Sequence, residues 1–394
     1  MLLLIAASSP GFTNLYKRVR LKTDMDRVVV TPWEVSEEVD YTKLIQEFGV
    51  LPLGKLPPVF HENVLFRRNI VFAHRDFQRI LETISKKKKF VIMTGMMPTG
   101  KFHLGHMIVA QQIIFYQKLG ANVYLAVADL EAYNARHQGL EESRKIAIEE
   151  YVPNYIALGL KPERCEIYFQ SRRSRDAKKA NAYYMLQNLL ARHATFNEFR
   201  AIYGEIGPGK MISALLQAAD MLHPQLPEFE GVIPVIVPVG IDQDAHLRLA
   251  RDISQRMKDL RFIQLSSTYN KFIPSLNGGK MSSSDENSFI ALSDSAPEVE
   301  RKIRKYAFSG GRDSAEEHRA RGGDPEIDVS FQYLKFFFEQ DDKKLEKIYN
   351  EYRTGKLLTS ELKKITIEKI TTFLREHQKK RVQAKKVIGK YLKA

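Results

Sequence analysis

Cysteine and long apolar runs are scarce in this sequence, and each absence excludes a class of protein. The 394 residues include a single cysteine, Cys165. One thiol cannot form an internal disulfide, so a disulfide-stabilised secreted scaffold is excluded and a reducing compartment, the cytoplasm, is expected. No apolar run approaches the roughly 18 residues of a membrane-spanning helix, so no membrane partner is expected.

The first residues imitate a signal peptide but lack its essential parts. The apolar run from Leu2 to Ala7 is short, and no charged residue precedes it. We therefore expect residues 1–24 to be a disordered extension, with Met25 as an alternative start.

Positive charge is in excess, with 61 Lys and Arg against 47 Asp and Glu, a net +14. Residues 361–394 alone hold eleven Lys or Arg against three Glu. Such a run is often only a solvated helix face. It also suits a polyanionic partner such as a nucleic acid.

Short apolar runs alternate with helical patterns in the middle of the chain. The runs "FVIMTG", "NVYLAVADLEAY", "CEIYFQS" and "GVIPVIVPVG" are typical of buried strands. Strands that alternate with helices predict an α/β fold, a Rossmann-like doubly wound parallel sheet whose ligands bind at the carboxyl ends of the strands. We predict an appendage over 25–85, a Rossmann-like catalytic domain over 86–296 and an all-helical domain over 297–394.

The turn "TGMMPTGKFHLGH" joins the first predicted strand to the first helix. It contains neither Gly-Lys-[Ser/Thr] nor G-x-G-x-x-G, so neither common phosphate loop applies. His103 and His106 are three residues apart on one helical face, with Gly105 between them. A helix N-terminus with two imidazole donors suits a phosphate. Packing or surface histidines, or a zinc site with a third ligand elsewhere, remain alternatives.

A second motif, "GGKMSSSDENSF", places one lysine before three serines in a glycine-led loop over residues 278–287. It follows HLGH by about 175 residues. HLGH and KMSSS resemble the paired signatures of the class I aminoacyl-tRNA synthetases, in the family's order and spacing.

The resemblance implies attack of an amino-acid carboxylate on the α-phosphorus of ATP, with pyrophosphate leaving. The protein then supplies position and charge stabilisation rather than a nucleophile. Magnesium is expected on the triphosphate, with no tightly bound protein metal. The implied catalytic residues are His103, His106, Lys280, Ser282, Ser283 and Ser284. The implied ATP contacts are Thr94, Gly95, His103, Gly105, His106, Gly240, Lys280 and Met281.

Longer stretches, among them "GIDQDAHLRLARD", "ISALLQAADM" and "YAFSGGRDSAEEHR", resemble the tryptophanyl-tRNA synthetases of the archaeal and eukaryotic branch. The resemblance implies that Glu131 accepts from the indole N–H and that Met93, Gln217, Asp242 and Gln243 complete the tryptophan pocket. The chain departs from that branch at two pocket positions. Met93 stands where the eukaryotic members have tyrosine, and Ala126 where they have glutamine.

The resemblance also implies tRNA(Trp) as partner, with Arg312 and Asp313 reading an anticodon base, and a homodimer with an interface on the apolar helices after residue 176. Tyrosine activation on the same scaffold, and a non-catalytic paralogue that only binds tRNA or a partner, remain alternatives.

Overall fold

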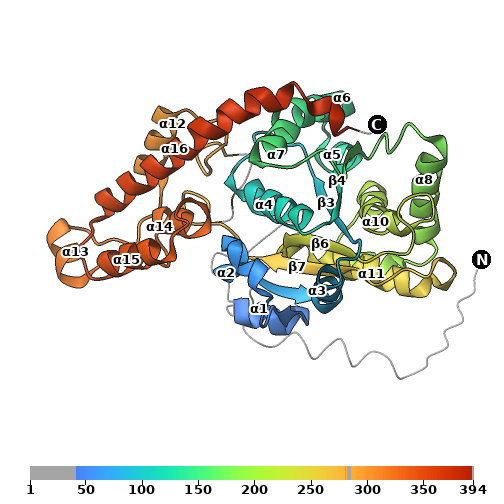
Figure 1. The fold of residues 1–394 in the computed structure, drawn as a ribbon, viewed down its shortest axis with the longest axis horizontal. Coiled ribbons are helices and arrows are strands. Elements are labelled where there is room, and N and C mark those ends of the chain that lie inside the picture. The colour runs from blue at the N-terminus through green and yellow to red at the C-terminus, as the bar shows by residue number, and fades with distance from the viewer. Residues whose placement is uncertain (1–40, 280, 282–284, 393–394) are drawn as a thin grey trace, which may run out of the picture.

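The computed structural model describes residues 41–279, 281 and 285–392. The predicted extension over 1–24 and the site candidates Lys280, Ser282, Ser283 and Ser284 lie outside these residues. The described chain forms an α/β body from which a helical C-terminal region extends to one side (Figure 1).

One seven-stranded sheet forms the centre of the body, in the order β1-β2-β7-β6-β3-β4-β5. The five strands from β7 to β5 are parallel, which confirms the predicted α/β class. The strands are β1 (Leu51–Pro52), β2 (Val71–Arg75), β3 (Val91–Met96), β4 (Asn122–Val127), β5 (Cys165–Phe169), β6 (Val235–Gly240) and β7 (Ser266–Asn270).

The last two strands at one side of the sheet come from the segment that the sequence assigned to an appendage. β2 pairs antiparallel with β7, and β1 pairs antiparallel with β2. Arg75 at the end of β2 donates to the buried carboxylate of Asp244, at 2.9 Å from Nε. This segment therefore extends the same sheet.

The helices of the body are α1 (Tyr41–Phe48), α2 (Val64–Arg67), α3 (Phe77–Ser85), α4 (Leu104–Lys118), α5 (Asp129–Arg136), α6 (Leu140–Ile146), α7 (Val152–Leu158), α8 (Ala177–Ala191), α9 (Phe196–Tyr203), α10 (Pro208–Leu222) and α11 (Asp244–Arg256). The C-terminal helices are α12 (Ala296–Tyr306), α13 (Ala315–Arg321), α14 (Val329–Tyr333), α15 (Asp342–Arg353) and α16 (Thr359–Lys385). Short π-helical segments cover Ala147–Tyr151 and Leu334–Phe338.

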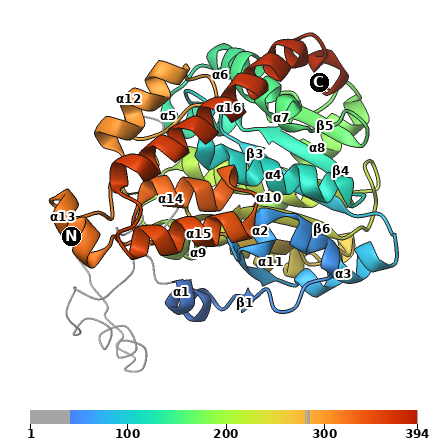
Figure 2. The ribbon, with the colours of Figure 1, turned by 60° about the vertical axis from the view of Figure 1, so that its left-hand side comes forward.

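Two hydrophobic clusters cover the two faces of the sheet, because side chains alternate along each strand. On β3, Ile92 and Met96 belong to the cluster that includes α4 and α7. Val91 and Met93 belong to the cluster that includes α8, α10 and α11. The first cluster continues without interruption into α12, α14 and α16, so the C-terminal region shares its core with the body (Figure 2).

Local signals explain where the sequence analysis missed elements. β7, "SSTYN", is fully buried but carries little apolar periodicity, so it was not predicted. Residues 177–203 hold two helices, α8 and α9, because Thr195 and Glu198 form a capping box that starts α9. Among the described residues, no helix is long and apolar enough to cross a membrane.

Candidate active site

The turn between β3 and α4 holds its two histidines in a reciprocal arrangement. His103 is the N-cap of α4, and its Nδ1 accepts from the backbone N–H of Gly105 at 3.1 Å. His106 Nδ1 accepts in turn from the backbone N–H of His103 at 3.2 Å. An imidazole that accepts at Nδ1 carries its proton at Nε2 when neutral. Both rings can therefore donate from Nε2, and their centroids lie 3.8 Å apart.

Burial determines the charge of this pair. It lowers the pKa of His106 to about 4. Burial, followed by the neighbouring His106, lowers the pKa of His103 well below its ordinary value. Both imidazoles are consequently neutral at pH 7, so any anion here meets neutral N–H donors and the positive end of α4.

The described part of the second motif lies against this turn. A Cβ placed on Gly105 would come 2.9 Å from the His103 ring and 3.4 Å from Met281 Sδ. The segment after the loop is also attached to the turn, because Leu104 N–H donates to Ile290 O at 3.2 Å. Two segments about 175 residues apart in the sequence therefore meet at the start of α4.

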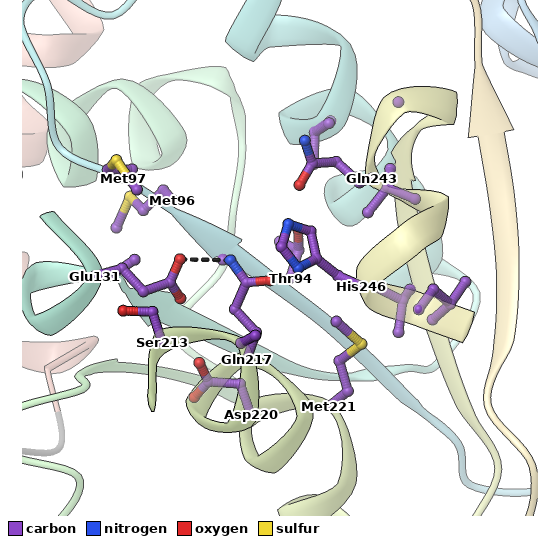
Figure 3. A pocket seen from close by; sticks show the side chains of 18 of the residues that line it. Thr94, Met96, Met97, Glu131, Ser213, Gln217, Asp220, Met221, Gln243 and His246 are labelled. Carbon is purple, nitrogen blue, oxygen red and sulfur yellow. Dashed lines mark hydrogen bonds between the residues drawn. The ribbon is translucent and has the colours of Figure 1, made fainter. Parts of the chain in front are cut away.

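A cavity of about 430 Å³ opens beside this turn, at the carboxyl ends of β3 and β6. That is where parallel sheets bind ligands. Figure 3 shows Glu131 from α5 facing Gln217 from α10, with Gln243, which directly precedes α11, and His246 from α11 across the end of β3. The sequence-predicted residues that line the cavity are Met93, Thr94, Gly95, Gly105, His106, Glu131, Gln217, Gly240 and Gln243.

The remaining candidates among the described residues lie outside the cavity lining. His103 is buried behind His106, and Met281 covers Gly105. Asp242 is buried and accepts from Gln243 Nε2 at 3.0 Å, so it holds a lining side chain. Arg312 and Asp313 are exposed in the loop between α12 and α13, and α13 lies at the far tip of the C-terminal region (Figure 1).

A pair of buried carboxylates forms the polar end of the cavity. Gln170 Nε2 donates to Glu131 and to Asp220, at 2.7 Å in each case. Gln217 Nε2 donates to the second oxygen of Glu131. Burial raises the pKa of Glu131 to about 7 and that of Asp220 to about 6.

Tyrosine hydroxyls and a buried arginine support Asp220 from behind. Tyr168 and Tyr183 donate to the same Asp220 oxygen at 2.6 and 2.7 Å. The fully buried Arg173 guanidinium lies 4.0 Å from the centroid of the Tyr168 ring and donates to Glu166. This packing fixes the carboxylates before any ligand binds.

Met93 and Ala126 are the two pocket positions at which the sequence differs from the eukaryotic pattern. Both side chains are apolar and buried, with exposed fractions of 2% and 0%. Met93 lines the cavity. Neither side chain can recognise a polar group in a ligand. The polar side chains that line the cavity include Glu131, Gln217, Asp220 and Gln243.

Sequence reasoning missed Asp220, Gln170 and His246. Asp220 is one helical turn after Gln217 on α10, so helical spacing could have found it. Gln170 directly follows β5, where strand-end residues reach the ligand edge. His246 has no such signal, and only the fold brings its Nδ1 to 2.7 Å from Tyr203 OH.

A zinc site was one alternative for the histidine pair. Within residues 41–279, 281 and 285–392, no group of three or more His, Cys, Asp or Glu is placed to hold a metal ion.

Comparison with known proteins gives a consistent picture. Residues 85–375 match the family described as "tRNA synthetases class I (W and Y)". The chain is 42% identical over 374 residues to the tryptophan–tRNA ligase of Methanocaldococcus jannaschii, covering 93% of this chain and 99% of that protein. It is 43% identical to the enzyme of the same name from Aeropyrum pernix, covering 91% and 96%.

Solved structures agree with this picture. The crystal structure of tryptophanyl-tRNA synthetase from Aeropyrum pernix matches with a TM-score of 0.84 at 42% identity, covering 92% of this chain and 99% of that one. Tryptophanyl-tRNA synthetase from Giardia lamblia matches with a TM-score of 0.80 at 30% identity, covering 89% and 95%.

The raised pKa of Glu131 predicts a pH-dependent gain in stability for Glu131→Gln. The folded pKa, about 7, lies above the ordinary value of 4.5. The contribution of this carboxyl to stability is therefore complete below about pH 4.5 and lost as pH rises through about 7. Glutamine does not ionise. From pH 5 to pH 8 the variant should gain on the order of 2–3 kcal/mol relative to the wild type, measured by urea denaturation.

Glu142→Gln is the matched control, because Glu142 is exposed on α6. As a substitution at the surface, it should stay within about 0.5 kcal/mol of the wild type at each pH. An equally flat difference for Glu131→Gln would show that Glu131 is ionised in the fold at neutral pH.

Proposed function

Because the chain belongs to the class I tRNA synthetases for tryptophan and tyrosine, we propose that it is a tryptophan–tRNA ligase. It activates L-tryptophan with ATP to tryptophanyl-adenylate and transfers the aminoacyl group to tRNA(Trp), releasing AMP and pyrophosphate. The observation that carries this proposal is one cavity with a neutral histidine pair at a helix start on one side and a buried carboxylate–amide cluster on another.

The reaction itself determines the roles that we propose. A tryptophan carboxylate oxygen attacks the α-phosphorus of ATP, a new O–P bond forms, and the bond to the pyrophosphate oxygen breaks. His103 and His106 donate from Nε2 to phosphate oxygens, and Gly105 and Gly240 allow close approach of the nucleotide. Thr94, Gly95 and Met281 complete the ATP contacts. Magnesium enters as part of the ATP substrate, on the phosphate oxygens.

Lys280, Ser282, Ser283 and Ser284, which lie outside the described residues, are proposed to meet the charge that builds on the leaving pyrophosphate. Support comes from their neighbours, since Met281 packs against Gly105 and residues 289–292 lie beside the His103 turn.

For the amino acid, we propose that Glu131 accepts from the indole N–H. Gln217 and Gln243 hold the ring or the head group, Asp242 orients Gln243, and Met93 supplies an apolar wall. A tyrosine ring in this place would offer no N–H to Glu131, so the acceptor capacity that Gln170 and Gln217 do not use would stay unsatisfied, which is costly.

Pyrophosphate–ATP exchange tests the proposed reaction. Exchange should depend on tryptophan, with tyrosine disfavoured on the order of 10⁴-fold because it has no N–H for Glu131. Radiolabelled pyrophosphate incorporation into ATP measures this for both amino acids. Exchange with tyrosine alone would establish the tyrosine alternative, and exchange with neither would establish a non-catalytic paralogue.

Two variants divide the roles within the same assay. Lys280→Ala should slow adenylate formation by roughly 10²-fold or more and leave tryptophan affinity near that of the wild type, because its role arises in the transition state. Equal losses of rate and affinity would contradict that role.

The same assay tests which carboxylate accepts from the indole N–H. If Asp220→Asn, and not Glu131→Gln, abolished discrimination against tyrosine, the indole acceptor would be Asp220.

We propose that the exposed Arg312 and Asp313 read an anticodon base of tRNA(Trp). Arg312 Nε donates to Gly322 O at 3.0 Å, which anchors the guanidinium to the loop directly after α13. Gly322 has φ +69°, and a Cβ there would collide with Arg353 O, so this loop requires its glycine. The basic, solvent-facing side of α16 supplies salt-dependent phosphate contacts.

Arg312→Ala should leave pyrophosphate exchange unchanged and weaken tRNA charging by about 1–3 kcal/mol, because it removes a base contact far from the cavity. Charging of tRNA(Trp) and exchange are measured on the same preparations. Arg321→Ala, on the neighbouring exposed arginine of α13, is the control and should lose less. A collapse of exchange in Arg312→Ala would contradict the assignment.

We also propose a homodimer in the cytoplasm. Met185 and Leu189 are 58% and 45% exposed and share one face of α8, at the edge of the body (Figure 1). Ile212 on α10 is also 50% exposed, and Gln187 Nε2 of α8 donates to its carbonyl. Such large exposed apolar side chains favour burial by a second copy. The single cysteine suits a reducing compartment.

Met185→Glu should convert a dimer into a monomer in light scattering, because a charge then faces the apolar surface. Val382→Glu, an exposed apolar residue on α16, is the control and should leave the mass unchanged. A monomeric wild type, or a dimer unaffected by Met185→Glu, would contradict this interface.

A further inference from the structure

The long helix α16 connects two distant parts of the molecule. Its 27 residues span about 40 Å at 1.5 Å per residue. Thr359 at its start lies 3.3 Å from Ser309 Oγ, just before the loop that carries Arg312. Its other end packs on α7 in the body (Figures 1 and 2). A single helix therefore joins the proposed anticodon region to the body.

Near its end, α16 makes a group of polar contacts with the body. His377 Nε2 lies 2.7 Å from Asn154 Oδ1. Gln378 Nε2 donates to Leu292 O at 3.1 Å. Arg381 Nη2 donates to Glu149 O at 3.0 Å and forms an ion pair with the Glu150 carboxylate.

Glu150 connects Arg381 to the histidine turn. One carboxylate oxygen pairs with Arg381, and the other accepts from the backbone N–H of Phe102 at 3.2 Å. Phe102 directly precedes His103. Both charged side chains are 17% exposed, so water screens this pair less than it screens a surface pair.

The local sequence prepares Glu149 and Glu150 to receive the arginine. They lie in the π-helical segment Ala147–Tyr151, a type of irregularity that is frequent at functional sites. Pro153 has no N–H, so it cannot bond to the carbonyl four residues earlier, that of Glu149. Arg381 Nη2 donates to this carbonyl instead.

A second series of hydrogen bonds connects α16 to Phe102, this time to its backbone carbonyl. Gln378 binds the Leu292 carbonyl, and the Leu292 N–H donates to Phe102 O at 2.9 Å. Through Glu150 and Leu292, α16 thus fixes both the N–H and the carbonyl of Phe102.

We propose that Arg381 and Glu150 are positioning residues for His103 and His106, through which the C-terminal helix sets the geometry of the phosphate-binding turn. The catalytic consequence rests on the proposed adenylation activity, whereas the mechanical link does not. An ordinary tether between two regions is the competing explanation. Arg67 and Arg68 on α2, which bind Asp342 at the start of α15, form such a tether.

Arg381→Met in the full-length chain should lower kcat for tryptophan-dependent pyrophosphate exchange by roughly tenfold, because misplacing a donor from a distance affects the reaction step. KM for tryptophan should change little, since Glu131 and Gln217 lie on α5 and α10. Arg381→Lys should recover part of the rate. Glu150→Gln should match Arg381→Met, and the double variant should be no worse than either, because both remove one contact.

Two control variants separate positioning from tethering. Glu376→Gln changes a charge at an exposed position on the same helix and should keep the wild-type kcat. Arg67→Met weakens the α2–α15 tether and should cost stability in urea without lowering kcat.

Hydrogen–deuterium exchange of the ligand-free protein tests the mechanical link without any activity. The amides of residues 105–107 should exchange faster in Arg381→Met than in the wild type, Glu376→Gln or Arg67→Met. Unchanged protection of these amides, an unchanged kcat, or an equal loss of kcat in Arg67→Met would overturn the inference. A wild type without tryptophan-dependent pyrophosphate exchange would instead overturn the proposed function. The amide protection would then still decide whether Arg381 positions the histidine turn.

Discussion

The reciprocal hydrogen bonds between His103 and His106 at the start of α4 are the constraint on which the candidate site depends. Each imidazole uses Nδ1 to accept a backbone N–H, which leaves Nε2 as the donor on both rings. Burial keeps both rings neutral, so what they can offer to an anion is directed N–H groups rather than a fixed positive charge. The neighbouring segments are arranged around this turn. β3 precedes it in the chain, and residues 290–292 form backbone hydrogen bonds with residues 102 and 104. Glu150 accepts from the backbone N–H of Phe102, the residue before His103.

The same exclusion of water has the opposite effect on the carboxylates of the cavity. Burial raises the pKa of Glu131 and of Asp220, so their charge is expensive to keep and their hydrogen bonds are correspondingly selective. Gln170 and Gln217 partly compensate by donating to them, and the tyrosines behind Asp220 fix its orientation. A ligand N–H that completes this network relieves a buried polar group, whereas a ring without one leaves it unsatisfied. The burial of these carboxylates therefore has two effects: it makes their ionised form costly to the fold, and it makes them require a hydrogen-bond donor from a ligand.

The C-terminal region is more than an attached module. The hydrophobic cluster on the α4 face of the sheet runs on into α12, α14 and α16, and the buried pair of Lys302 with Asp294 fixes the segment beside the histidine turn. A helix that shares a core with the body cannot shift without disturbing it, because packed interiors deform little. This is why contacts made by the far end of α16 reach the start of α4.

The sequence by itself determined the class of fold, since strand and helix periodicities are local, and it determined the family, since HLGH, KMSSS and the longer GGRD and GIDQD stretches are contiguous. It also identified nine of the residues that line the cavity, because motif residues at strand ends and helix starts meet at one edge of a parallel sheet. The tertiary structure alone decided the partners of those residues. The polar strand β7, the link from Gln170 to both Glu131 and Asp220, and the contact of Arg381 with Glu150 join positions from about 30 to more than 200 residues apart. Burial and hydrogen-bond partners depend on what the folded chain places alongside a residue, and no local pattern of residue types carries that information.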